Sequence, residues 1–137
     1  MNGIRTRIRV TGICMAAVFI LASIAGCGGD PSQDDVLNQL KPDNNETYAL
    51  HLFYENILPD SETTELNKFH NSDQRLTTAI TKVQFWDQEQ ERNVKWASAI
   101  GIKDFPMYVL LDRKGIVLET PYLSRIEEFL AESLLKE

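Results

Sequence analysis

The chain has 137 residues, with 14 Lys and Arg, 20 Asp and Glu, a net charge of −6 and two cysteines. This length suits a single domain and argues against a two-domain enzyme. The acidic balance argues against nucleic-acid binding, which normally needs a basic patch, and two cysteines are too few for a scaffold of several disulfides.

Residues 1–26 have the organisation of an export signal. Three arginines give the segment a positively charged start: Arg5, Arg7 and Arg9. An apolar run follows over residues 13–24. It is shorter than the roughly 20 apolar residues of a membrane-spanning helix, but it suits the core of a signal peptide. The run closes on Ile24-Ala25-Gly26-Cys27, which resembles the lipobox of bacterial lipoproteins.

The lipobox resemblance implies a covalent anchor on Cys27. In lipoproteins the cysteine sulfur receives diacylglycerol, and cleavage makes the cysteine an acylated N-terminus; such paired acyl chains (commonly palmitate) hold a protein stably at a membrane. We therefore expect a lipoprotein on the extracytoplasmic face of the cell membrane, inner or outer if the cell has two. The alternative is a plain N-terminal membrane anchor with an incidental Cys27. Removing the signal leaves 11 basic and 20 acidic residues, a net charge of −9 that falls within residues 27–91.

Residues 27–46 are expected to be the lipidated cysteine and a flexible acidic tether. The segment is rich in Asp, Asn, Gly and Pro, and such a composition cannot bury enough apolar surface to offset the entropy of ordering. Three apolar residues leave one alternative open, a single helical turn or docking spot: Val36, Leu37 and Leu40.

Residues 47–137 alternate between strand and helix patterns. Apolar runs of strand length predict strands over residues 48–54, 82–87, 107–112 and 116–120. Helical patterns lie between the first two strands, between the second and third, and after the fourth. Capping boxes predict that two of these helices start at Asp87 and Ser124. The predicted fold is therefore α/β, in the order β-α-β-α-β-β-α. Its mixed central sheet is flanked by helices, with the first two strands parallel and the last two forming a hairpin.

One stretch carries a family resemblance: Gly101-Ile-Lys-Asp-Phe-Pro106-Met-Tyr-Val-Leu-Leu-Asp-Arg-Lys-Gly115-Ile-Val-Leu. It resembles thioredoxin-like proteins, and its turn at residues 112–115 is most similar to the membrane-anchored TlpA/ResA branch. The resemblance implies a thioredoxin-like domain over residues 47–137 and a cis bond before Pro106. In that family the bend exposes the backbone of the preceding residue to a bound peptide, so we expect a binding surface at Phe105, Pro106 and Met107. The alternative is an ordinary trans proline at the start of a strand.

The chain departs from that family where the chemistry would be. Redox members place Cys-x-x-Cys after the first strand, where a lowered thiol pKa makes the first sulfur a nucleophile. The matching region here, residues 54–61, has no cysteine, and neither does any position in residues 28–137. Cys14 leaves with the signal and Cys27 would carry lipid. The mature domain therefore has no thiol for dithiol–disulfide exchange.

Other chemistry has little support in the sequence. His51 lies in an apolar strand and is interpreted as a packed core histidine, and His70 as a solvated loop residue; they lack metal-ligand spacing. Asp60, Ser61 and His70 could form a catalytic set only if the fold brought them together. Four nearby acids are interpreted as a solvated helix start, with cation or basic-partner binding as the alternative: Glu55, Asp60, Glu62 and Glu65.

The sequence therefore predicts a lipoprotein with a redox-inactive thioredoxin-like domain that serves as a protein-binding or adaptor module. No catalytic residue, metal site or cofactor is expected apart from the lipid on Cys27, and the balance favours a protein that is not an enzyme. The expected partners are the membrane, through the anchor, and an unidentified protein. The alternative function is a thioredoxin-like enzyme or accessory factor of extracytoplasmic thiol–disulfide metabolism that acts through a partner's cysteines.

Overall fold

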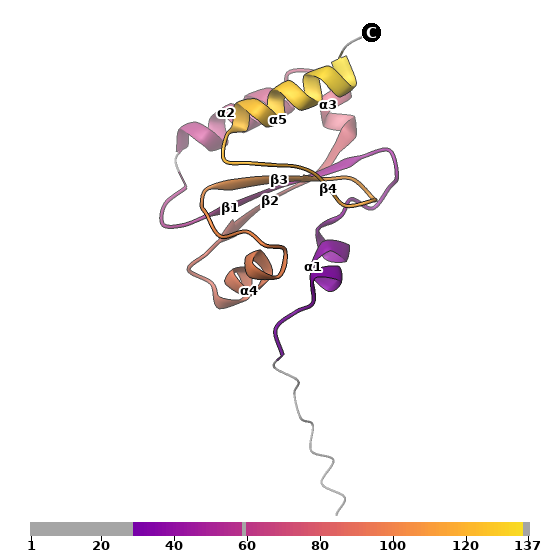
Figure 1. Cartoon of the computed structure of the whole chain (residues 1–137). Helices are drawn as coiled ribbons and strands as arrows, with labels where there is room; N and C mark the ends of the chain where they lie inside the picture. The colour runs from indigo at the N-terminus through magenta and orange to yellow at the C-terminus, as the bar shows by residue number, and fades with distance from the viewer. Residues whose placement is uncertain (1–28, 59, 136–137) are drawn as a thin grey trace, which may run out of the picture.

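The computed structural model describes residues 29–58 and 60–135 (Figure 1). The predicted signal and Cys27 lie outside these residues. The elements follow in this order: α1 (Gln33–Leu40), β1 (Tyr48–Tyr54), α2 (Asp60–His70), α3 (Gln74–Ala79), β2 (Ile80–Asp87), α4 (Glu91–Ala99), β3 (Met107–Leu111), β4 (Ile116–Thr120), α5 (Leu123–Leu130) and the π-helix η1 (Ala131–Leu135). Within the described ranges, none of the helices is both long enough and apolar enough to cross a membrane.

The four strands form one mixed sheet in the order β2-β1-β3-β4. β1 and β2 are parallel, whereas β3 is antiparallel to both of its neighbours, β1 and β4. The predicted mixed sheet, parallel crossover and terminal hairpin are therefore confirmed. In the β1–β3 register Phe53 lies opposite Met107, so the Phe105–Pro106 bond lies beside the end of β1.

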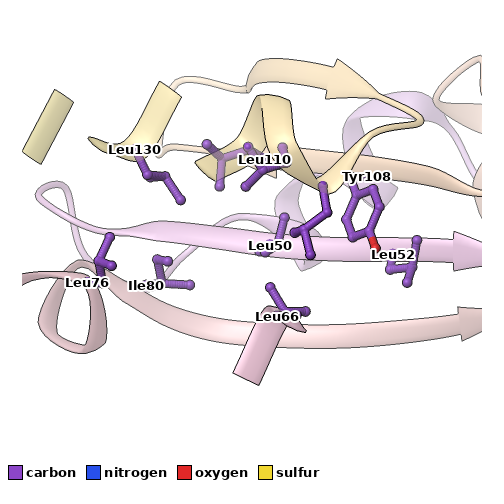
Figure 2. Close-up of a cluster of buried hydrophobic side chains, with 10 residues drawn as sticks. Leu50, Leu52, Leu66, Leu76, Ile80, Tyr108, Leu110 and Leu130 are labelled. Atoms are coloured by element: carbon purple, nitrogen blue, oxygen red, sulfur yellow. The ribbon is translucent and has the colours of Figure 1, made fainter. Parts of the chain in front are cut away.

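Helices cover both faces of the sheet, with α2, α3 and α5 on one side and α1 and α4 on the other (Figure 1). Successive strand residues alternate between the faces, so Leu50 and Leu52 pack with one group of helices and Phe53 with the other. Figure 2 shows the first of these cores, in which strand and helix side chains point toward one another. Both cores and all four strands lie within residues 29–135, so a fragment of residues 29–137 contains every element of the packed unit.

Helix α1 corrects the expectation of a flexible tether. The Ser32 side chain caps the helix by accepting a hydrogen bond from the Asp35 backbone N–H. Val36 and Leu40 are fully buried against the α4 side of the sheet. The alternative, a helical turn or docking spot at Val36, Leu37 and Leu40, is the one that holds, because two apolar residues one helical turn apart bury enough surface to order the helix. The spacer interpretation is therefore wrong for residues 33–40, and packing begins before residue 47.

Two predicted helix starts are also wrong. Helix α4 begins at Glu91, after an N-cap residue, Gln90, that makes no side-chain capping bond, while the Asp87 carboxylate accepts from the backbone N–H of Glu89 in the preceding turn. Helix α5 begins at Leu123, so Ser124 already lies inside it. Short polar side chains stabilise turns as well as helix caps, so the motif alone did not locate either start.

Candidate functional site

The bond between Phe105 and Pro106 is cis, as the resemblance predicted. Pro106 is exposed, whereas Phe105 and Met107 are half-buried against the core beneath α4. The proline therefore stands at the surface where β3 begins, next to Tyr54 at the end of β1.

A cavity of about 270 Å³ opens at this turn. Its lining comes from the end of β1, the loop that follows, the first turn of α2 and the proline turn: Tyr54, Glu55, Asn56, Ile57, Leu58, Glu62, Phe105 and Pro106. The fold thus brings two predicted residues, Phe105 and Pro106, together with the loop that follows β1. Met107 is not part of this lining because its side chain packs into the core.

Ile57 is the residue of this site that sequence reasoning missed. Its side chain is 89% exposed, although isoleucine is usually buried. The neighbouring Asn56 has a left-handed backbone with φ of 60°, a conformation that asparagine tolerates better than most residues. The available signal was an apolar pair, Ile57 and Leu58, in a short loop between Asn56 and Pro59. Ile57 presents an apolar side chain to solvent at the mouth of the cavity.

Glu62 connects the cavity to the core. The hydroxyl of Tyr108, a residue of β3 that is only 1% exposed, donates a hydrogen bond to the Glu62 carboxylate. Burial, then the hydrogen bond to Glu62 and the Glu62 charge, raise the pKa of Tyr108 above its ordinary value. Glu62 is half-buried, so its interpretation as one of four solvated acids is wrong, whereas Glu55, Asp60 and Glu65 are exposed as expected.

Removing the Tyr108 hydroxyl is expected to destabilise the fold. Tyr108→Phe leaves the half-buried Glu62 carboxylate without its donor, and a hydrogen bond to a charged group contributes about 2 kcal/mol. Urea denaturation of the wild type and variant measures this difference. The matched control is Tyr122→Phe, because the Tyr122 side chain is exposed; its effect should stay within about 0.5 kcal/mol. Equal losses in both variants would contradict a structural role for this bond.

The fold does not assemble a catalytic triad from Asp60, Ser61 and His70. The first two begin α2 and His70 ends it, so about 15 Å separates the two ends of the helix. His70 lies partly buried, with its Nε2 3.1 Å from the Ile80 carbonyl oxygen, rather than in a solvated loop. Among the described residues, no group of three or more His, Cys, Asp or Glu could hold a metal ion.

His51 is the packed core histidine that the sequence predicted. It is 0% exposed and joins three elements. The indole N–H of Trp86 on β2 donates to His51 Nδ1 at 2.9 Å, and the Leu40 carbonyl at the end of α1 lies 2.8 Å from Nε2. An indole N–H only donates and a carbonyl only accepts. The ring is therefore neutral, with its hydrogen on Nε2, and serves structure rather than the candidate site.

Neither a family model nor a curated protein matches this chain. Solved structures do. Thioredoxin f2 of Chlamydomonas reinhardtii aligns with a TM-score of 0.55 at 14% identity, covering 78% of this chain and 96% of that one. A thioredoxin-like protein of Clostridium perfringens aligns with a TM-score of 0.48 at 16% identity, covering 84% of this chain and 90% of that one. A thioredoxin-fold protein of Helicobacter pylori aligns with a TM-score of 0.46 at 15% identity, covering 75% of this chain and 81% of that one. The similarity to thioredoxin f2, together with the mixed sheet and its flanking helices, shows that this chain has a thioredoxin-like fold.

Proposed function

We propose that this chain is a bacterial lipoprotein, anchored by lipid on Cys27 at the extracytoplasmic face of the cell membrane, whose thioredoxin-like domain binds a protein segment without thiol chemistry. The TlpA/ResA-like turn at residues 112–115 and the lipobox support this assignment. The only cofactor in this proposal is the covalent lipid, and no residue has a catalytic role.

One observation carries the binding proposal. The loop after β1, which in the thioredoxin resemblance matches the region of the reactive cysteines, here lines a cavity of mixed polarity. Ile57, Leu58 and the Phe105–Pro106 turn supply apolar surface, and Glu55, Asn56 and Glu62 supply polar groups. An exposed apolar side chain at the rim of a cavity loses contact with water when a partner docks, which favours association. The absence of cysteine from residues 28–137 leaves binding, rather than dithiol exchange, as the use of this surface.

The start of α1 sharpens the anchoring part of the proposal. Only residues 28–32 separate Cys27 from the helix, and five extended residues span at most about 18 Å. The domain would therefore lie close to the membrane rather than on a long tether. The acids nearest the anchor in the sequence are Asp30, Asp34 and Asp35, and anionic headgroups would repel them.

The test uses the full chain in a bacterium that exports it. A photo-cross-linking amino acid replaces Ile57, or Val94 as the control, since Val94 is an exposed apolar residue on α4 outside the cavity lining. We expect a discrete protein adduct at position 57 and none at position 94. Adding Phe105→Asp to the position-57 protein should lower the adduct yield at least about tenfold, the loss typical of a binding hot spot.

Mass spectrometry of the same purified protein reports on both parts of the proposal. The expected N-terminus is Cys27 with diacylglycerol and an amide-linked acyl chain. Equal adducts at both positions, or none, would contradict binding at this surface, and an unprocessed N-terminus would contradict the anchor. A partner whose own cysteines cycle between thiol and disulfide would favour the alternative, an accessory factor in extracytoplasmic thiol–disulfide metabolism.

A further inference from the structure

Strand β2 forms an uncovered edge of the sheet. It pairs with β1 on one side only, and no other strand of the described residues lies on its outer side. Eight residues, Ile80–Asp87, follow this edge. An edge of this length presents backbone N–H and C=O groups to any strand of matching sequence, and proteins usually block such an edge with lysine, proline or a bulge.

The one lysine of β2 does not block it. The Lys82 ammonium donates to the carbonyls of Gln39 and Lys41, at 3.3 Å and 2.9 Å, and is therefore held by the end of α1. A bulge interrupts β2 at Thr81, near the start of the strand. The four residues after Lys82, Val83 to Trp86, pair regularly with β1 and carry no charge and no proline. The middle of the edge thus lacks the usual protection against strand addition.

Two grooves flank this edge. The groove toward α2, about 290 Å³, is lined by one face of α2 and by residues of β2 that include Val83 and Phe85. The groove toward α4, about 360 Å³, reaches Gln84 and Arg92. Phe85 is 41% exposed. Although the whole chain has a net charge of −6, neither groove is lined by a carboxylate. Along these two grooves, therefore, no carboxylate of one copy would repel a carboxylate of the other.

We propose that β2 pairs antiparallel with β2 of a second copy, which extends the sheet across a two-fold axis. Such an axis keeps the α2 faces of both copies on one side. If Gln84 of one copy lies opposite Gln84 of the other, Val83 of each copy lies opposite Phe85 of the other copy. An aromatic residue opposite a β-branched one is a favourable cross-strand pair. Lys82 then lies opposite Trp86, and no like charges face each other, so the strand is complementary to itself.

Single cysteines test this register, because residues 28–137 contain no native thiol. The protein is the fragment of residues 29–137, with circular dichroism confirming that each variant is folded. Opposed residues of an antiparallel pair have Cα atoms about 4.5–5.5 Å apart, within disulfide reach. Gln84→Cys should therefore form a disulfide dimer at least about tenfold faster than Ser98→Cys, an exposed position on α4. A mixture of Val83→Cys and Phe85→Cys should cross-link more than either variant alone.

Sedimentation of the cysteine-free fragment gives an independent readout. We expect a concentration-dependent dimer that Phe85→Lys abolishes while the fragment stays folded. A monomer at about 1 mM, the weak end of specific association, would overturn the proposal and leave the edge to a strand of another protein. Equal cross-linking at positions 84 and 98 would overturn it as well, because it would indicate random collision.

Discussion

Lowering the pH from about 7 to about 4 is expected to reduce the free energy of unfolding by roughly 3 kcal/mol through His51 alone. Burial, as the largest cause, lowers the pKa of His51 from 6.5 to about 4 in the folded protein, and the Lys82 charge lowers it further, against the opposing effect of the Leu40 hydrogen bond. Protonation would also direct a new N–H at the Trp86 N–H, which cannot accept it.

The direction of this pH effect follows from where the proton binds more tightly. Between about pH 6.5 and pH 4 the unfolded chain binds a proton at His51 and the folded chain does not. The free energy of unfolding therefore rises with pH in this window. The contribution of His51 is complete above pH 6.5 and is lost as the pH falls toward 4.

Urea denaturation as a function of pH measures the effect, and the two histidines supply the control. His51→Gln keeps one donor and one acceptor but does not titrate, so its pH dependence should be flatter than that of the wild type by roughly 3 kcal/mol across the window. His70→Gln makes the same exchange at the end of α2 and should leave the His51 contribution in place. A His51→Gln curve parallel to the wild-type curve would contradict a neutral buried His51.

Leu40→Ala is expected to lower the free energy of unfolding by about 3 kcal/mol, the cost of a cavity in a packed core. Leu40 is 0% exposed, and its backbone carbonyl holds His51 Nε2. In a flexible tether the same substitution would cost almost nothing. The Leu40→Ala substitution therefore tests whether α1 packs against the sheet or belongs to a flexible tether.

The control is Leu37→Ala in the same helix. Leu37 is only half-buried at the margin of the same core, so its loss should be less than half that of Leu40→Ala. Thermal and urea denaturation of residues 29–137 compare the two variants. A Leu40→Ala protein within about 0.5 kcal/mol of the wild type would mean that α1 does not pack in solution.

Local patterns in the sequence predicted much of the fold. The strands have apolar runs of strand length, and β1 and β3, which have a neighbour on each side, are the most apolar of them. The turn at residues 112–115 indicated the hairpin of β3 and β4. The parallel pairing of β1 and β2 follows from their crossover through helices. The cis bond before Pro106 came from the family resemblance, not from periodicity.

The sequence by itself thus determined which residues avoid water, where strands run, and that residues 28–137 lack a thiol. Only the tertiary structure decided which other side chains and backbone groups those residues contact. Helix α1 is ordered because Val36 and Leu40 pack into a core with residues of β1 and β2, and because the Leu40 carbonyl contacts His51. The Glu62 carboxylate accepts a hydrogen bond from Tyr108, 46 positions away. The free edge of β2 likewise depends on the order of the strands in the sheet. Such contacts join segments distant in the chain, and their energy depends on geometry that no local pattern contains.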